Sequence, residues 1–304
     1  MTILITGATG LIGRAFLEMA SPDADTVALA RDPSTIPLAS SRGPVDWLAV
    51  DLRDPGFARA LPRRADAIVH LAQAREYREF PERAVGIFDV NLGATARLLD
   101  YAHRAGVERF VFASTATIYQ PSHAPLTERS PIQCTSYYSA SKRAAELLIG
   151  QYGELFRCWL LRIFTVYGVG QRDQLIANLV RRIAGDEPVA IQGHSGLPLS
   201  PIHAADVAQV VLRAATPGEA TPESRCGVVN VGGYEQLGIR DLAEEIGRAL
   251  GAAPRFVFTA GDDPPGFIAD RALLDRTFSG LESISFADGI RRVLAEGDIA
   301  MSTR

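Results

Sequence analysis

Short apolar runs alternate along the chain with longer segments in which apolar residues recur every three or four positions. Several of the short runs are almost entirely apolar, which is typical of strands buried on both faces of a parallel sheet. The strands that they predict are Thr2–Thr6, Thr26–Ala30, Asp46–Val50, Ala67–Leu71, Arg109–Ser114, Cys158–Phe164 and Val228–Val231. The longer segments predict helices at Leu11–Ala20, Ala84–Ala105, Ser139–Gln151 and Gln174–Ala184. This alternation predicts an α/β fold with a doubly wound parallel sheet.

The alternation weakens beyond Gly168. Residues 168–203 and 233–304 are richer in proline and glycine and contain fewer candidate strands. We therefore predict a larger α/β domain of residues 1–167 and 204–232, with a smaller, mainly C-terminal lobe made of residues 168–203 and 233–304. A chain of 304 residues is long enough for this arrangement.

Composition and charge narrow the range of partners and compartments. Hydrophobic residues make up 47% of the chain, and the formal net charge of -4 gives no basis for a nucleic-acid or membrane-surface partner. The N-terminus has no basic leader, and no apolar segment is long enough to span a bilayer, so we expect a cytoplasmic protein. The cysteines (Cys134, Cys158 and Cys226) and the five histidines lack metal-ligand spacing, so we expect no metal site.

A glycine-rich turn follows the first predicted strand directly. Gly7 permits a tight turn, Gly10 lets the backbone approach a pyrophosphate, and Gly13 lets the next helix pack closely on the sheet. The exposed N–H groups and the positive end of the helix dipole would hold the anion. This pattern predicts a Rossmann-like domain that binds a dinucleotide. The other cofactor contacts that we expect from this turn are Thr9, Leu11 and Ile12.

The end of the second predicted strand bears on the choice between NAD and NADP. A carboxylate there accepts hydrogen bonds from the ribose 2'-hydroxyl of NAD, whereas an arginine accommodates the 2'-phosphate of NADP. The position is Ala30, followed by Arg31 and Asp32. NADP is therefore favoured over NAD, with Arg31 as the phosphate contact. The alternative is that Arg31 is a solvated loop charge and Asp32 a turn residue.

Tyr138 and Lys142 are four residues apart and therefore share one face of a predicted helix. Lys142 is the single lysine among 31 basic residues, and a lone lysine would fall four residues after one of the eight tyrosines by accident in about 3% of cases. A nearby ammonium, together with the positively charged nicotinamide of the oxidised cofactor, stabilises tyrosinate, so we expect a lowered Tyr138 pKa. The phenol could then exchange a proton with a substrate hydroxyl or carbonyl while hydride moves to or from the cofactor.

With these motifs the chain resembles the extended short-chain dehydrogenase/reductases of the NAD(P)-dependent epimerase/dehydratase family over nearly its whole length. The other segments that carry the resemblance are Asp51-Leu52, His70–Ala72, Asn91–Thr95, Ser114–Tyr119, Leu161–Gly168 and His203–Ala208.

The resemblance implies roles for particular residues. Asp51 and Leu52 would flank the adenine, and Lys142 would also bind the nicotinamide ribose. Asn91 either supports the cofactor site or caps its helix. The remaining residues that the resemblance places in the cofactor groove are Leu71, Ala72 and Phe164.

The resemblance also assigns the group that hydrogen-bonds the reacting oxygen. This group would be Thr115, just after the fifth strand, with Thr117 and Ser114 as the alternatives. Thr117 and Thr165 are the candidate substrate contacts.

Three departures from the family pattern bear on the substrate. Ala116-Thr117 stand where sugar 4,6-dehydratases carry an Asp-Glu pair, so we do not expect dehydration. Thr165 replaces an asparagine that commonly faces the sugar nucleotide. Residues 196–203 and 259–263 lack the two arginines that grip the substrate diphosphate in many members. The candidate replacements are Arg172, Arg181 and Arg271.

We therefore expect an NAD(P)-dependent epimerase or ketoreductase that acts on a hydroxyl or carbonyl carbon of a nucleotide-sugar-like small molecule, with Tyr138 as acid and base. One alternative is a carbonyl reductase or alcohol dehydrogenase for a non-nucleotide metabolite, which the missing arginines favour. Another is a non-catalytic NAD(P)-sensing regulatory protein, against which the intact Tyr–Lys pair counts. Family members commonly dimerise through two helices, here Ala84–Ala105 and Ser139–Gln151, so a homodimer is one expected assembly.

Overall fold

The computed structural model describes residues 1–21, 24–35, 43–219 and 225–296. Within these residues a seven-stranded parallel sheet has the order β10-β6-β5-β4-β1-β2-β3. Its strands are β1 (Thr2–Thr6), β2 (Asp25–Ala30), β3 (Val45–Ala49), β4 (Ala67–His70), β5 (Arg109–Thr115), β6 (Arg157–Ile163) and β10 (Cys226–Val231). Each strand lies within two residues of its predicted range, and the predicted doubly wound, Rossmann-like sheet is confirmed.

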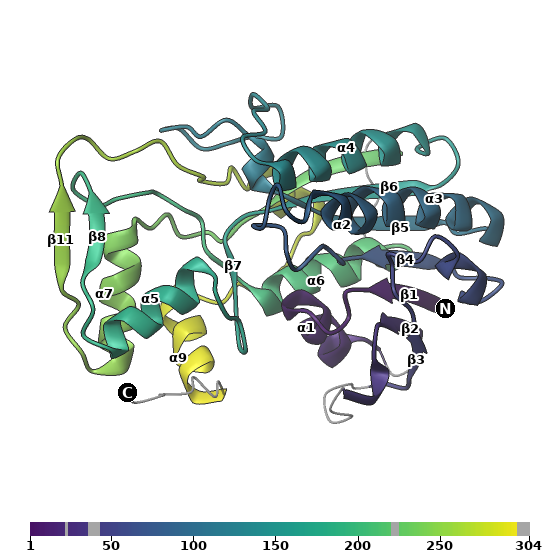
Figure 1. Cartoon of the computed structure of the whole chain (residues 1–304), viewed down its shortest axis with the longest axis horizontal. Helices are drawn as coiled ribbons and strands as arrows, with labels where there is room; N and C mark the ends of the chain where they lie inside the picture. Colours follow the sequence, from purple (N-terminus) through teal and green to yellow (C-terminus); the bar gives the residue numbers. More distant parts are fainter. Residues whose placement is uncertain (22–23, 36–42, 220–224, 297–304) are drawn as a thin grey trace.

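The sheet is covered on both faces because successive side chains of each strand point to opposite sides. One face packs against α1 (Leu11–Met19), α6 (Ala204–Ala215) and α8 (Ala272–Thr277), and the other against α3 (Ala94–Ala105) and α4 (Tyr137–Gln151). Figure 1 shows these two helical layers. Strands β4 and β5 are buried along their whole length, which explains their nearly continuous apolar sequence.

The predicted helix at Ala84–Ala105 is interrupted. It consists of α2 (Ala84–Phe88), a π-helical turn η4 (Asp89–Gly93) and α3. The helix α4 begins at Tyr137, where Ser136 forms a reciprocal cap: its Oγ accepts from the Ser139 N–H at 3.1 Å, and Ser139 Oγ accepts from the Ser136 N–H at 3.1 Å. This cap fixes the start of the helix that carries Tyr138 and Lys142.

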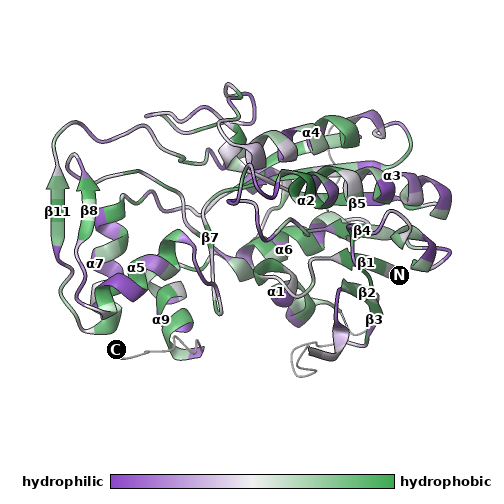
Figure 2. Ribbon diagram, viewed as in Figure 1, coloured by the Kyte–Doolittle hydropathy of each residue, from purple (hydrophilic) through white to green (hydrophobic). Residues whose placement is uncertain are grey.

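A second group of elements lies beside one end of the sheet (Figure 1). Strands β8 (Val189–Gln192) and β11 (Phe256–Thr259) pair in parallel, and α5 (Leu175–Ala184), α7 (Ile239–Leu250) and α9 (Phe286–Glu296) pack with them around a separate apolar core. Figure 2 shows apolar residues along the inner faces of these helices and along the central strands. Of these elements the sequence pattern predicted only α5. A short pair, β7 (Val166–Tyr167) with β9 (Ile202–His203), connects this group to the main sheet. None of the described helices is long and apolar enough to cross a membrane.

Candidate active site

The glycine turn joins β1 to α1 through direct backbone packing. Gly7 has a φ of +73°, a conformation that side-chain-bearing residues rarely adopt, and its carbonyl accepts from the Gly10 N–H at 2.9 Å. A Cβ on Gly7 would lie 2.7 Å from the backbone nitrogen of Ala72, and a Cβ on Gly13 would lie 2.3 Å from the Gly7 carbonyl oxygen. The turn, the loop after β4 and the first turn of α1 therefore form one tightly packed unit.

This unit fits a dinucleotide pyrophosphate. The first turn of α1 contains no acidic residue, and Gly10 provides no side chain that would cap its N–H groups. These groups are therefore open to an anion at the positive end of the helix dipole. Leu11 and Ile12 are partly buried beside them, and Arg14 fixes the loop by donating from Nε to the Thr9 carbonyl at 3.0 Å.

Two arginines lie just after β2 and β3, where the sequence predicts that the adenosine binds. Arg31 is exposed directly after β2, whereas Asp32 accepts from the N–H and hydroxyl of Ser34, at 3.1 and 2.5 Å, and so serves a local turn. Asp51 forms a close ion pair with Arg53, with Nη2–Oδ2 at 2.6 Å. Arg53, and to a smaller extent Arg31, lowers the pKa of Asp51. Arg53 was not anticipated from the sequence.

Tyr138 and Lys142 lie on the first turns of α4, close to the end of β5. The Lys142 side chain is buried, and its Nζ donates to the Ala113 carbonyl at 2.7 Å and lies 4.6 Å from the centre of the Phe112 ring. Burial lowers the pKa of Lys142 to about 7, and the Glu146 carboxylate partly opposes this shift.

The groups of the protein do not by themselves produce the expected lowering of the Tyr138 pKa. Burial raises the pKa of Tyr138, and the Thr115 hydroxyl acts in the opposite direction. The Lys142 ammonium bonds a backbone carbonyl rather than the phenol, and the Tyr138 hydroxyl donates to Gln73 Oε1 at 2.9 Å. The protein groups alone therefore hold Tyr138 as a neutral phenol.

Thr115 is the last residue of β5, and its side chain interacts with the phenol of Tyr138. Its hydroxyl oxygen also lies 3.0 Å from the hydroxyl of Thr117 and accepts from the Thr117 N–H at 3.2 Å. Ser114 is engaged elsewhere, because its hydroxyl donates to Glu146 Oε1 at 2.6 Å. The structure thus brings Thr115, Thr117, Tyr138 and Lys142 together.

Comparison with known proteins agrees with this geometry. The family model described as NAD dependent epimerase/dehydratase matches residues 3–232. The chain belongs to this family. It is 30% identical to the dTDP-4-dehydro-6-deoxy-D-allose reductase of Streptomyces bikiniensis over 297 residues, covering 91% of this chain and 88% of that protein.

Two further proteins are similar to this chain, one by sequence and one by structure. The UDP-glucose 4-epimerase of Streptomyces lividans is 26% identical over 292 residues, covering 88% of this chain and 87% of that protein. The crystal structure of Thermus thermophilus UDP-glucose 4-epimerase in complex with NAD has a TM-score of 0.79 and 25% identity, covering 97% of this chain and 98% of that one. This family member is an NAD(P)-dependent enzyme of the extended short-chain dehydrogenase/reductase type, as the sequence predicted.

Asn91 lies in the π turn, with both ends of its amide engaged by the protein. Its Oδ1 accepts from the Ala74 N–H at 2.8 Å, and its Nδ2 donates to Ser141 Oγ at 2.9 Å. Ser141 in turn donates to the Tyr138 carbonyl at 2.7 Å. Asn91 therefore links the loop after β4 to the first turn of α4, as a supporting residue would, and it does not cap its helix.

His70 serves packing rather than proton transfer. Its Nδ1 lies 2.7 Å from Thr6 Oγ1 and its Nε2 lies 3.0 Å from Thr95 Oγ1. Burial lowers its pKa to about 3, so the imidazole is neutral. The bonds tie β1 and β4 to α3 next to the glycine turn.

A loop after β4 brings residues to the site that the sequence did not single out. The ring of Tyr77 lies 4.8 Å, between ring centres, from that of Tyr138. Gln174 Nε2 donates to the Tyr77 hydroxyl at 2.8 Å, and Arg78 donates to Gln174 Oε1 at 3.0 Å and to the Asp173 carbonyl at 2.6 Å. This loop is polar and irregular, so neither periodicity nor a motif indicated its place beside Tyr138.

The remaining candidates fall into two groups. Phe164 and Thr165 follow β6: Phe164 is buried, its N–H donates to the Val231 carbonyl at 2.9 Å, and the Thr165 carbonyl accepts from the Ile202 N–H at 2.9 Å. Of the candidate replacement arginines, Arg271 is engaged with Gly232 and Asp275, and Arg181 with Asn178, whereas Arg172 is exposed in the loop before α5.

Proposed function

We propose that this enzyme interconverts a hydroxyl and a carbonyl group on the sugar of a nucleoside diphosphate sugar, as an epimerase or a ketoreductase. The observation that carries the proposal is the grouping of Thr115, Tyr138 and Lys142 at the end of β5, next to the glycine turn. Two relatives that span nearly the whole chain are named for reactions at sugar carbons of UDP and dTDP sugars. We assign sugar binding to the lobe of residues 168–203 and 233–304.

Each catalytic residue has a separate part in this reaction. Tyr138 donates a proton to a carbonyl oxygen or removes one from a hydroxyl, and Thr115 hydrogen-bonds the same oxygen. Lys142 provides positive charge behind the phenol and is held rigidly by the Ala113 carbonyl. NAD(P), when bound, supplies the hydride donor or acceptor.

The substrate's diphosphate needs positive charge that the two missing family arginines would otherwise provide. We assign this contact to Arg172, because its side chain is exposed close to Asp173, to which the loop after β4 is tied through Arg78. The absence of a carboxylate at Ala116-Thr117 argues against water elimination.

We further propose NADP as the preferred cofactor. Ala30 offers no acceptor for a ribose 2'-hydroxyl, Asp32 is turned to Ser34, and Arg31 and Arg53 place two guanidinium groups near the adenosine end. The Thermus thermophilus relative was solved with NAD, so the preference requires a direct measurement.

We also propose a homodimer formed by α2 and α4 of two copies. Val85 and Phe88 on α2, and Leu147 and Leu148 on α4, are large apolar side chains exposed to solvent on helices that contact one another. Leu147→Asp should convert the dimer to a monomer in light scattering.

We place the enzyme in the cytoplasm, in keeping with the lack of a disulfide among the described cysteines.

The decisive experiment is a turnover screen with matched substrates. UDP-sugars, dTDP-sugars and 4-keto dTDP-sugars are incubated with NAD(P)H or NAD(P), alongside simple ketones and free sugars, and the products are separated by chromatography. Turnover of nucleotide sugars by wild type, reduced at least about 100-fold in Tyr138→Phe, is expected. Turnover of simple ketones alone would identify a carbonyl reductase instead. Cofactor binding without any turnover would favour a sensor.

A further inference from the structure

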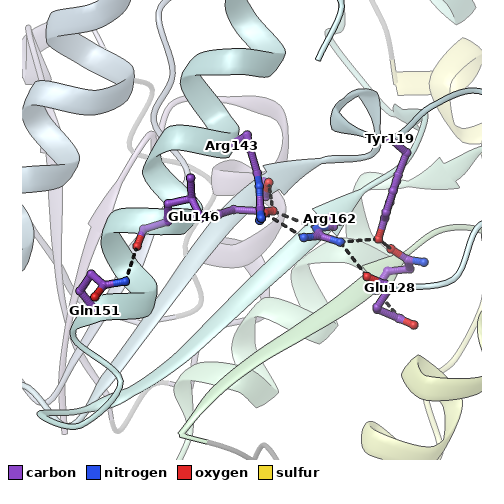
Figure 3. A network of polar contacts seen from close by, with 9 residues as sticks. Tyr119, Glu128, Arg143, Glu146, Gln151 and Arg162 are labelled. Carbon is purple, nitrogen blue, oxygen red and sulfur yellow. Dashed lines mark hydrogen bonds and ion pairs between the residues drawn. The ribbon is translucent and has the colours of Figure 1, made fainter. Parts of the chain in front are cut away.

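A buried ion pair lies directly behind the catalytic residues. Glu146, one turn after Lys142 on α4, and Arg162, on β6, are 2% and 4% exposed. The guanidinium holds the carboxylate with two bonds, Nε–Oε1 at 3.0 Å and Nη2–Oε2 at 2.9 Å (Figure 3). Burying two charges carries a large desolvation penalty, and an apolar pair of similar volume often stabilises a fold equally well. This ion pair therefore calls for an explanation other than stability.

The ion pair is hydrogen-bonded to one residue before Thr115 in the chain and to one residue after it. On the near side, the hydroxyl of Ser114 donates to Glu146 Oε1 at 2.6 Å. On the far side, Arg162 Nη1 donates to the hydroxyl of Tyr119 at 2.7 Å, and Tyr119 donates to Asn230 Oδ1 at 2.7 Å. Figure 3 shows Arg162 between Glu146 and Tyr119. Thr115 and the short helix η5 (Ala116–Ile118) therefore lie between two residues that are held by one ion pair.

The same carboxylate acts on Lys142. The titratable groups that interact electrostatically with the ammonium are Glu146 of its own helix and His70 of β4, and His70 is neutral. Glu146 raises the pKa of Lys142 against the effect of burial. Arg162, Ser114 and Arg143 hold the pKa of Glu146 below its usual range, so its negative charge persists.

We propose that the Glu146–Arg162 pair is a positioning device that holds the Thr115 hydroxyl in register with Tyr138 and fixes a negative charge one helical turn from Lys142. Neither residue touches the reacting atoms; both act through Ser114, Tyr119 and Lys142. The catalytic half of this inference rests on the proposed function, whereas the protonation of Lys142 can be measured without turnover.

Because Lys142 is the only lysine, it can be observed directly. Protein labelled with [ε-13C]lysine gives a single side-chain NMR signal, whose titration reports the Lys142 pKa. Glu146→Gln keeps the shape of the side chain and removes its charge. It should shift the titration midpoint at least half a unit lower than in wild type, while Arg143→Met, which removes only the partly exposed neighbour of Glu146, should not lower it. An unchanged midpoint in folded Glu146→Gln would overturn the electrostatic half.

Kinetics test the positioning half. Glu146→Gln should reduce kcat at least tenfold with KM changed less than threefold, and should move the alkaline limb of the kcat profile to lower pH. Tyr119→Phe, which removes the hydroxyl that joins Arg162 to Asn230 and leaves Glu146 in place, should reduce kcat about threefold without moving that limb. Wild-type kcat in both variants would refute positioning. If wild type turns over no nucleotide sugar, the proposed function fails while the NMR result still stands.

A variant that lacks both charges is the control for misfolding of Glu146→Gln. Glu146→Gln leaves Arg162 buried without its partner and is a candidate for misfolding. Glu146→Leu combined with Arg162→Met removes the pair together and should fold, with a kcat loss of at least tenfold and a lowered Lys142 pKa. A folded double variant with wild-type kcat and Lys142 titration would overturn the proposal as a whole.

Discussion

Replacing Gly13 with alanine should weaken cofactor binding and lower thermal stability. A Cβ at this position would lie 2.3 Å from the Gly7 carbonyl oxygen, 2.6 Å from Ala8 Cα and 2.8 Å from the Ala8 carbonyl carbon. All three are backbone atoms of the glycine turn, so no side chain can rotate away to make room. The only available relaxation is a displacement of the turn from α1.

The size of the effect follows from these distances. Restoring an ordinary contact of about 3.5 Å requires roughly 1 Å of backbone movement. Overpacking of this kind costs about 1–3 kcal/mol, of which alanine recovers about 0.5–1 kcal/mol through its helix propensity. A net loss of about 1–2 kcal/mol corresponds to a Tm lowered by roughly 2–5 °C. Displaced N–H groups lose about 1.5–3 kcal/mol with a charged acceptor, which is roughly a 10- to 100-fold weaker Kd for the cofactor.

Gly150→Ala is the matched control. Gly150 lies in α4, is exposed, and a Cβ there meets nothing within 4 Å, so alanine should leave cofactor affinity unchanged and raise stability by about 0.5–1 kcal/mol. Both variants are compared with wild type by thermal denaturation and by fluorescence titration with NADPH and NADH. If Gly13→Ala behaved like Gly150→Ala in both assays, the turn would not be the packed anion site described above.

Three further changes test other parts of the molecule. Arg31→Ala should weaken NADPH binding about tenfold and NADH binding less than twofold in the same titration, and an unchanged ratio of the two affinities would contradict the NADP proposal. Lys142→Arg should reduce kcat at least about 100-fold, because the larger guanidinium cannot occupy the buried ammonium position beside the Ala113 carbonyl. Retained turnover in this variant would show that the position does not require an ammonium. Asp206 tests the pH dependence of stability: burial raises its pKa to about 6, so its ionisation destabilises the fold progressively as the pH rises from about 4 through 6. Asp206→Asn should therefore stabilise the protein at pH 7.5, by on the order of 1–2 kcal/mol after solvent screening, and have little effect at pH 4.5; equal gains in thermal denaturation at both pH values would exclude this cause.

The central sheet could be predicted because its strands are buried on both faces. Such strands consist of continuous apolar runs, and β4 and β5 follow this pattern closely. By contrast, β8 alternates buried and exposed residues over only four positions, and β11 is largely exposed. Their short patterns do not differ from those of loops. They are strands because they pair with each other over the core of the second lobe, which is a tertiary effect.

The candidate site was predictable where a motif fixes local geometry. The spacing of Tyr138 and Lys142 places both on one helical face, and the glycine turn is recognised by its position directly after β1. The contributions of Gln73, Tyr77 and Arg53 depend on how loops from distant parts of the chain fold over the sheet. No local pattern contains that information.

The Glu146–Arg162 pair could be predicted from the sequence only in part. A glutamate four residues after Lys142 on a helix normally indicates a solvated face, and nothing local shows that this one is buried. Arg162, however, interrupts an apolar strand that is buried on both faces, and a guanidinium there must have an anionic partner. The partner must come from a helix that covers the same face of the sheet, and α4 is the helix whose inner side also carries Lys142. A charged residue within an otherwise apolar, buried strand thus marks the point where α4 is attached to the sheet.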